Sequence, residues 1–430
     1  MVSNPKTRLA LIQMLVAFLF LFANAPWLSA QTSTRLEITG TTMGVVGYSV
    51  VAFADSDVAT ELKASVAEEL ESVNQRMSTY IADSEVSRFN QSTSTDWFSI
   101  SRETAEVVQK AQEISELSDG AFDITVQPLV ARWKFSKDKS KLTKIPDKAS
   151  IAADLKRVGY KKLQVRLDPP ALKKSVAGLQ IDLSAIAKGY AVDMVAERLQ
   201  AMGLDNFLIE VGGEVRASGE KPDETSWRVG IEKPLPGARE PYQIIALYHQ
   251  ALASSGDYRN FFELNGKRYS HTIDPRTGYP VDHAVTATSV IAQDCTTADA
   301  MATAIMVLGR DGGIQLANKA GVKALILSET NNQLLATKTA NFPSNEKESM
   351  IQEGGSFLKL VGIVSVFFLL AVLAMAIGVI CGRERIKGSC GGIAALENPD
   401  ITPECSLCSR AAECNDLKKE LKKRQTETDS

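Results

Sequence analysis

Two segments of this 430-residue chain carry side chains whose types and spacing suit a diphosphate and a divalent cation. Asp182 closes a predicted strand, and Lys188 with Gly189 opens a predicted helix, where free backbone N–H groups and a lysine charge favour phosphate. Asp299 and Thr303 are four residues apart on another predicted helix, so their oxygens share one face. With a loop carbonyl, such hard oxygen ligands suit Mg²⁺, which bridges substrate phosphates. From the pattern alone, a solvated helix face is the simpler interpretation of Asp299 and Thr303.

Other polar segments could bring a ligand close to the backbone or supply a base. Residues 210–214 read Glu-Val-Gly-Gly-Glu, which predicts a strand that ends in a tight turn accessible to a ligand. Residues 254–259 are expected to form a loop. Residues 269–278 combine His271 with Asp and Arg in a turn-rich stretch, where the imidazole could act as a general base or could cap a turn. Both interpretations of His271 stay open.

The composition excludes several classes of protein. Lys plus Arg total 48 and Asp plus Glu total 51, for a net charge of -3, which argues against a nucleic-acid binder. Only three histidines are present, so a His-rich metal site is excluded and the chemistry must rest mainly on carboxylates, hydroxyls and backbone groups. The chain has no Gly-x-Gly-x-x-Gly after a first strand and no Walker lysine loop, which argues against a doubly wound nucleotide-binding fold.

Hydrophobic spacing places these residues on a mixture of helices and strands. Apolar residues at helical spacing predict helices at 57–74, 102–118, 185–202 and 298–308. Ser101 is a good N-cap for the helix that follows it, and Gly309 is expected to end the last one. Short β-rich runs predict strands at 47–53, 207–211, 227–231 and 244–248. Because helices and strands do not alternate regularly, the pattern predicts an α+β fold with a mainly antiparallel sheet.

The ends of the chain predict an exported protein held in a bacterial inner membrane. Residues 1–30 form a signal peptide, with a basic start, an apolar run and a break at Pro26, that is either cleaved or kept as an N-terminal anchor. Residues 31–345 form the main body and residues 346–359 a linker. Residues 360–382 carry no charge, and these 23 residues exceed the roughly 20 that a transmembrane helix needs. The signal and the basic residues after the span place the body in the periplasm and the tail, 383–430, in the cytoplasm.

The tail collects most of the cysteines. Of six in the chain, only Cys295 lies in the body, whereas Cys381 ends the predicted span and the tail carries Cys390, Cys405, Cys408 and Cys414. Clustered thiols on the reducing side of a membrane are not expected to form structural disulfides. A Cys-x-x-Cys pair with two further thiols suits zinc or iron, while a redox sensor and unliganded cysteines remain open alternatives.

Seven motifs occur in a single order along residues 35–340. They are Thr42-Met43-Gly44, Met77-Ser-Thr-Tyr80, Ser118-Asp-Gly-Ala-Phe-Asp123, Ile181-Asp-Leu-Ser-Ala-Ile-Ala-Lys188, Ser255-Gly-Asp-Tyr-Arg259, His271-Thr-Ile-Asp-Pro-Arg-Thr-Gly278 and Ala298-Asp-Ala-Met-Ala-Thr303. This set strongly resembles the ApbE family of FAD:protein FMN transferases. The resemblance implies a T-fold-like α+β domain. It also implies Mg²⁺-dependent transfer of FMN from FAD to a Thr or Ser hydroxyl of client flavoproteins, through a phosphoester and with release of AMP.

The resemblance also implies three groups of site residues. FAD would be bound by Met43, Tyr80, Gly120, Ala121, Phe122, Asp123, Asp182, Lys188 and Ile273. Mg²⁺ would be held by the Ala185 carbonyl, Asp299 and Thr303. His271 is the candidate base for the client hydroxyl, with Asp257 and Arg259 in support. The chain departs from the family pattern at Ala302, where some members have an acid, and at Val45, where members usually have Thr.

The segment from Phe357 to Cys414 resembles a second family, NqrM. The likeness rests on the end of the apolar run and on Lys387-Gly-Ser-Cys390-Gly-Gly392 with the clustered cysteines after it. NqrM is a small membrane protein needed to mature the sodium-translocating NADH:quinone reductase by supplying iron. The resemblance therefore implies that the tail handles iron. That reductase carries covalent FMN, and its subunits are therefore the expected clients. A protein that stores FAD and an FAD pyrophosphatase are the alternative functions for the body.

Overall fold

The computed structural model describes residues 34–135, 144–235, 240–257, 261–264, 266–331 and 333–344, with Ser365 and Phe368 beyond them. The chain divides into two compact units, residues 1–350 and 351–430, and the architecture below is that of the first. The predicted signal peptide, the predicted span apart from those two residues, and the cysteine-rich tail lie outside the described residues. Within the described part of the chain, no helix is long and apolar enough to cross a membrane.

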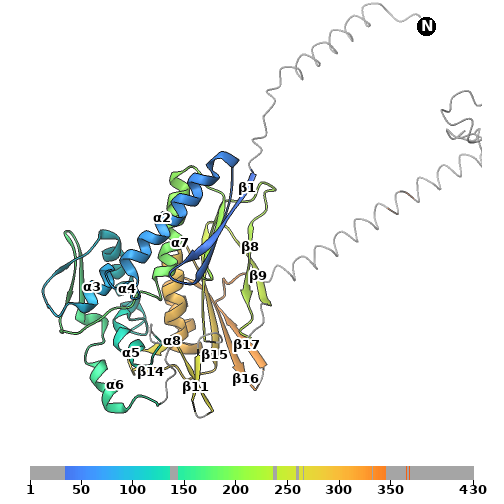
Figure 1. The fold of residues 1–430 in the computed structure, drawn as a ribbon. Coiled ribbons are helices and arrows are strands. Elements are labelled where there is room, and N and C mark those ends of the chain that lie inside the picture. Colours follow the sequence, from blue (N-terminus) through green and yellow to red (C-terminus); the bar gives the residue numbers. More distant parts are fainter. Residues whose placement is uncertain are drawn as a thin grey trace, which may run out of the picture. The chain divides into compact units, whose positions relative to one another are not determined.

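An eight-stranded antiparallel sheet forms the centre of the first unit (Figure 1), as the sequence pattern predicts. In spatial order its strands are β1 (Thr34–Thr42), β2 (Val46–Ala54), β6 (Phe207–Val211), β7 (Glu214–Ser218), β10 (Gln250–Gly256), β15 (Val285–Ala292), β16 (Lys323–Thr330) and β17 (Gln333–Lys338). Every neighbouring pair in this order is antiparallel. Consecutive strands such as β6 and β7 are joined by tight turns, which antiparallel pairing permits.

Long helices pack against one face of this sheet and enclose the main core (Figure 1). They are α2 (Ala59–Met77), α4 (Arg102–Leu117), α7 (Ala187–Ala201) and α8 (Cys295–Ala320). Helix α2 buries Leu62, Val66, Leu70 and Val73, whose spacing of three or four residues sets its apolar stripe. The Ser101 side chain accepts from Thr104 N at 3.3 Å, which confirms the predicted N-cap of α4.

A separate hairpin covers part of the opposite face of the sheet. Its strands are β8 (Trp227–Glu232) and β9 (Pro241–Leu247). Trp227, Ile231, Ile245 and Leu247 pack there on apolar side chains of the sheet, including Leu252. The sheet is therefore buried on both faces, by helices on one side and by a hairpin on the other.

The remaining elements build a smaller region at one end of the helical layer (Figure 1). Its α-helices are α3 (Glu85–Gln91), α5 (Gln127–Arg132) and α6 (Lys148–Leu155), and its 3-10 turns are η2 (Ile124–Val126) and η3 (Tyr160–Lys162). A further 3-10 turn, η1 (Ser56–Val58), lies outside this region and directly precedes α2. Its short strands are β3 (Phe98–Ser99), β4 (Leu163–Leu167), β5 (Pro170–Lys174), β11 (Phe261–Leu264), β12 (Lys267–Ser270), β13 (Ile273–Asp274) and β14 (Tyr279–Pro280).

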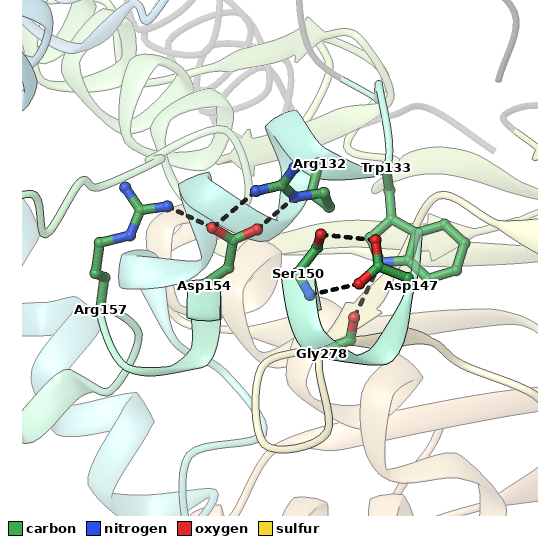
Figure 2. A network of polar contacts seen from close by, with 7 residues as sticks. All are labelled: Arg132, Trp133, Asp147, Ser150, Asp154, Arg157 and Gly278. Atoms are coloured by element: carbon green, nitrogen blue, oxygen red, sulfur yellow. Dashed lines mark hydrogen bonds and ion pairs between the residues drawn. The ribbon is translucent and has the colours of Figure 1, made fainter. Parts of the chain in front are cut away.

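Polar contacts fix α5 and α6 to the loop between β13 and β14 (Figure 2). Asp154 is 1% exposed and pairs with both Arg132, at 2.6 Å, and Arg157. Burial would raise the pKa of this carboxyl, but the hydrogen bonds and charges of the two arginines more than offset burial and lower it. The Trp133 indole N–H donates to the Gly278 carbonyl at 2.9 Å. These contacts set the position of the segment that carries Ile273 and His271.

Three sequence expectations about local structure need correction. Residues 254–256 belong to strand β10 and not to a loop, because their backbone pairs with β15. Asp182 does not close a strand: it lies in the connection between β5 and α7. Gly309 does interrupt the helical run, with φ 73° and ψ -168°, but a second helical stretch continues from it to Ala320.

Candidate active site

A gap in the sheet creates a large cavity. Strand β7 begins only at Glu214, so it pairs with β10 at Gln250–Leu252, and on that side the second half of β10 has no strand partner among the described residues. A cavity of about 1340 Å³ occupies this region. Its walls come from strands β2, β8, β10 and β15, the β6–β7 turn, the end of α2, the start of α7, the first half of α8, and loops of the smaller region. The volume exceeds the roughly 300–1,000 Å³ of pockets for drug-sized ligands, so it suits a larger ligand such as a dinucleotide.

Most of the residues that the sequence singled out line this one cavity. They are Met43, Tyr80, Ala121, Phe122, Asp123, Asp182, Ala185, Lys188, His271, Ile273, Asp299 and Thr303. Gly120 and Asp257 are not among the lining residues. Asp257 instead pairs with Arg268 at 3.3 Å, and Arg259 lies outside the described residues. The structure thus brings together residues that lie more than 200 positions apart in the chain.

The first turns of α7 and α8 meet at the base of the cavity. The Gly189 N–H donates to Asp299 Oδ2 at 3.0 Å. Asp193, one turn further along α7, accepts from the backbone N–H groups of Cys295 at 2.9 Å and Thr296 at 2.8 Å. The carboxylate of Asp193 therefore satisfies donors that the start of α8 leaves free. These contacts hold Lys188 on α7 and Asp299 on α8 in fixed relative positions.

Lys188 lies between two buried carboxylates. Its Nζ is 2.5 Å from Glu214 Oε1 and 3.6 Å from Asp299 Oδ1. Burial by itself would lower the pKa of Lys188, but the charges of Asp299 and Glu214 raise it well above its usual range, so the ammonium is retained. Burial raises the pKa of Glu214 to about 7, against the opposing effect of Lys188.

The oxygen atoms at this end of the cavity fit a hard divalent cation. The Asp299 carboxylate, the Thr303 hydroxyl one turn later on α8, and the Ala185 residue before α7 all line the cavity. Asp299 is only 4% exposed, and a buried carboxylate beside a hydroxyl and a backbone carbonyl is the donor chemistry that Mg²⁺ prefers. The buried Glu214 Oε2 nearby accepts no hydrogen bond from the described residues, which leaves an acceptor for a ligand or its water shell.

Apolar and aromatic side chains line another part of the cavity. Tyr80 is 51% exposed, and its loop is held by the Ser84 and Ser87 hydroxyls, which both donate to the Ser78 carbonyl. Burial, and then the charge of Asp182, raise the pKa of the Tyr80 phenol. Met43, with φ 47°, lies in the turn between β1 and β2. A flat aromatic ligand could stack on the Tyr80 ring in this part of the cavity.

Asp123 and Asp182 have different surroundings although both line the cavity. Asp123 accepts from Thr125 N, from Thr125 Oγ1 and from Tyr160 N at 2.7–2.8 Å, so its oxygens are already occupied in holding the local turn. Asp182 accepts from Ser184 N at 2.8 Å. Burial raises the pKa of both carboxyls. Asp182 consequently keeps more acceptor capacity for a ligand than Asp123 does.

His271 reaches the cavity from the segment between β12 and β13. Its ring meets Phe135 edge-on, with centroids 6.5 Å apart. The turn that follows is closed by the Gly278 N–H, which donates to the Asp274 carbonyl at 2.8 Å. The geometry places the imidazole on the cavity wall, so its predicted role as a base remains open to test.

Glu214 is the site residue that the sequence pattern did not assign. It is 2% exposed, lines the cavity and forms the shortest ion pair of Lys188. The available signal was an acid directly after the Gly212-Gly213 turn, at the first position of a buried strand. Acids are rarely fully buried unless they are paired, so an acid at this position predicts a cationic partner nearby.

Comparisons with known proteins agree with this architecture. Residues 39–326 match the ApbE family model, and residues 379–427 match the model described as (Na+)-NQR maturation NqrM. The chain is 38% identical over 310 residues to the FAD:protein FMN transferase of Vibrio cholerae, which covers 72% of this chain and 92% of that protein. It is 36% identical over 323 residues to the same-named protein of Haemophilus influenzae, covering 73% of this chain and 92% of that protein.

Solved structures show the same fold. The flavin transferase ApbE from Vibrio cholerae superposes with a TM-score of 0.65 at 36% identity, over 72% of this chain and 98% of that one. The apo form of the Pseudomonas stutzeri flavinyl transferase ApbE gives a TM-score of 0.66 at 35% identity, over 73% and 97%. Fold and cavity therefore place the described unit in the structural class of these flavin transferases. The chain belongs to the ApbE family, and an NqrM-type segment follows at its C-terminus.

The contact between α7 and α8 predicts an intolerance to any side chain at Gly189. A Cβ there would overlap the Cys295 carbonyl and lie 2.9 Å from Asp299 Cβ. We expect Gly189→Ala to lower the free energy of unfolding by about 2–3 kcal/mol, because α7 must move off α8. Urea unfolding followed by tryptophan fluorescence measures this. Gly47→Ala, where a Cβ meets no atom within 4 Å, is the control, and equal stabilities of the two variants would contradict the tight contact.

Proposed function

We propose that this chain transfers FMN from FAD to a Thr or Ser hydroxyl of a client flavoprotein, in a Mg²⁺-dependent reaction that forms a phosphoester and releases AMP. The observation that carries the proposal is one cavity that joins a half-exposed tyrosine to Lys188, at the start of α7, and to the Asp299–Thr303 pair on α8. The names of the related enzymes support the same reaction. A dinucleotide that spans these two regions would have its flavin against Tyr80 and its diphosphate near Lys188.

The residues of the chain divide the work of binding. The Lys188 ammonium, at the start of α7, would neutralise charge on the diphosphate. Asp299, Thr303 and the Ala185 carbonyl would hold Mg²⁺, which when bound stabilises charge on the phosphate oxygens and makes AMP a better leaving group. The cavity walls position FAD and the client hydroxyl for in-line displacement, and positioning supplies much of the rate in phosphoryl transfer.

The transfer step balances without an oxidant or reductant. The client hydroxyl oxygen forms a bond to the FMN phosphorus, and the bond from that phosphorus to the bridging oxygen breaks. The bridging oxygen leaves with AMP, and the hydroxyl proton passes to a base. His271 is the proposed base, since it lines the cavity and an aliphatic hydroxyl is a very weak acid.

Storage of FAD and hydrolysis of FAD are the alternative functions of the body. All three activities separate in one assay, in which the protein is mixed with FAD, Mg²⁺ and a client peptide. A fluorescent client on a denaturing gel supports transfer. Free FMN with an unlabelled client supports hydrolysis, and bound but unchanged FAD supports storage.

The proposed metal site predicts that Asp299→Ala lowers client labelling by at least about 100-fold, because charge on the transferred phosphate is no longer stabilised. The labelling gel, run as a time course, measures the change. Asp311→Ala is the control on the same helix, since Asp311 is 78% exposed and pairs only with its neighbour Arg310 among the described residues. Normal labelling by Asp299→Ala would rule out this carboxylate as a metal ligand.

We further propose that the body is periplasmic, that residues 360–382 span the inner membrane and that residues 383–430 are cytoplasmic. Export by residues 1–30 and the uncharged length of the span support this arrangement. Because Cys295 is fully buried, thiol reactivity should report on the C-terminal cysteines.

The proposed topology predicts which thiols react with a membrane-impermeant maleimide. In intact spheroplasts the wild-type chain should stay unlabelled, and it should react once the membrane is opened. Ser94→Cys adds a thiol on the exposed surface of the body and should be labelled from outside in both cases. Labelling of the wild-type chain in unopened spheroplasts would overturn the proposed orientation.

For the tail we propose iron or zinc binding in the service of one client, the sodium-translocating NADH:quinone reductase. The match of residues 379–427 to a maturation factor of that enzyme supports this client. One chain would then install FMN outside the membrane and handle metal inside it.

The tail is accordingly expected to carry about one metal ion per chain in the protein purified in detergent, and to lose it when the Cys-x-x-Cys pair is removed. Iron and zinc analysis of the wild type and of the Cys405→Ser, Cys408→Ser double variant tests this. Cys295→Ser, in the body, should keep the metal. Equal metal content in all three proteins would exclude a thiolate site in the tail.

A further inference from the structure

The position of Lys188 raises a problem for the proposed metal site. Its ammonium lies 3.6 Å from Asp299 Oδ1, the carboxylate that is proposed to bind Mg²⁺. An ammonium in direct contact with a carboxylate competes with a cation for that carboxylate, and the competition is strong where water is excluded. Asp299 is 4% exposed, so this is such a place.

A second carboxylate holds the ammonium on the other side. Glu214 Oε1 is 2.5 Å from Lys188 Nζ, more than 1 Å closer than Asp299 Oδ1 is. Within the described residues, these two acids are the ones that form ion pairs with Lys188. If the Glu214 charge were removed, Asp299 would be the carboxylate left for the flexible lysine to approach.

The β6–β7 turn fixes Glu214 in place. Gly212, with φ +64°, packs so tightly that a Cβ there would lie 2.7 Å from Val46 Cγ1 and 3.6 Å from Lys188 Cδ. The Gly213 N–H donates to Glu210 Oε1 at 2.9 Å, which further stabilises the turn. Glu214 is the first residue after this turn, so its carboxylate enters the cavity from a rigid support.

A purely structural role accounts poorly for this glutamate. Glu214 is 2% exposed, yet its Oε2 accepts no hydrogen bond from the described residues. Buried carboxylates that serve only the fold normally have both oxygens satisfied. One oxygen of Glu214 therefore binds Lys188, and the other remains available to a ligand or its water shell in the cavity.

We propose that Glu214 is a positioning residue that holds Lys188 away from Asp299 and so keeps Asp299 available for the metal. This inference rests on the proposed function, which supplies the divalent metal at Asp299. Lys188 can still bind a diphosphate in the cavity, but it does not form the close ion pair with Asp299 that would compete with the cation.

A double-mutant cycle on the full-length protein in detergent tests the inference without any turnover. Mn²⁺, which shares the oxygen-ligand preference of Mg²⁺, is titrated and followed by electron paramagnetic resonance. Glu214→Gln should weaken Mn²⁺ binding about tenfold, which is about 1.4 kcal/mol. Adding Lys188→Met to that variant should bring the affinity to within about threefold of Lys188→Met alone, because the competing ammonium is gone.

Further variants separate three causes of a lower Mn²⁺ affinity: movement of Lys188, the loss of one negative charge anywhere on the protein, and a folding defect. Glu220→Gln, at an exposed acid just after the end of β7 that does not line the cavity, should leave Mn²⁺ affinity within about twofold of wild type. Thermal melts of all variants report on folding, and Lys188→Met alone should bind Mn²⁺ at least as tightly as wild type. A tenfold loss that persists in the double variant, or no loss in Glu214→Gln, would overturn the inference.

The result also distinguishes this inference from the proposed function. A wild-type protein that binds no Mn²⁺ would overturn the metal site and the inference together. A wild type that shows the full Mn²⁺ pattern but does not label a client would count against the transferase function and leave the role of Glu214 standing.

Discussion

The contact between the first turns of α7 and α8 is the constraint on which the site depends. The two helices can approach this closely because residue 189 is a glycine and has no side chain. Asp193 on α7 accepts hydrogen bonds from two backbone N–H groups at the start of α8. Helix N-termini repel one another electrostatically, since each carries partial positive charge. Buried carboxylates on both sides of the contact offset that repulsion. The contact thereby fixes Lys188 and Asp299 side by side on the cavity wall.

Sequence patterns were sufficient where the determinant is local. The spacing of Asp299 and Thr303 on one helix, the Ser101 cap and the strand that runs into Gly212 all depend on neighbouring residues, and the structure has them as predicted. The antiparallel sheet also follows from the order of helices and strands. The motifs that indicated the ApbE family brought most of their side chains to one cavity.

What could not be predicted depends on contacts between distant segments. Glu214 pairs with Lys188 across 26 positions, and no local pattern encodes that partner. Asp123 lines the cavity, as the resemblance implies, but its hydrogen bonds from Thr125 and from the distant Tyr160 could not be predicted. Residues 254–256 could not be recognised as a strand, because the β15 residues with which they pair are more than 30 positions away in the sequence. The cavity itself arises from a difference in strand length, which only the assembled sheet reveals.

The short contact between β7 and β10 has a mechanical consequence. Three residue pairs join the four strands β1, β2, β6 and β7 to the four strands β10, β15, β16 and β17. A seam this narrow forms few backbone hydrogen bonds between the two halves, so side-chain packing must join them. Helix α8 crosses the seam on one face, since it packs on β7 as well as on β10 and β15, and the β8–β9 hairpin packs on both halves on the other face. Because α8 also carries Asp299 and Thr303, one helix both joins the two halves of the sheet and supplies the oxygen atoms proposed for the metal.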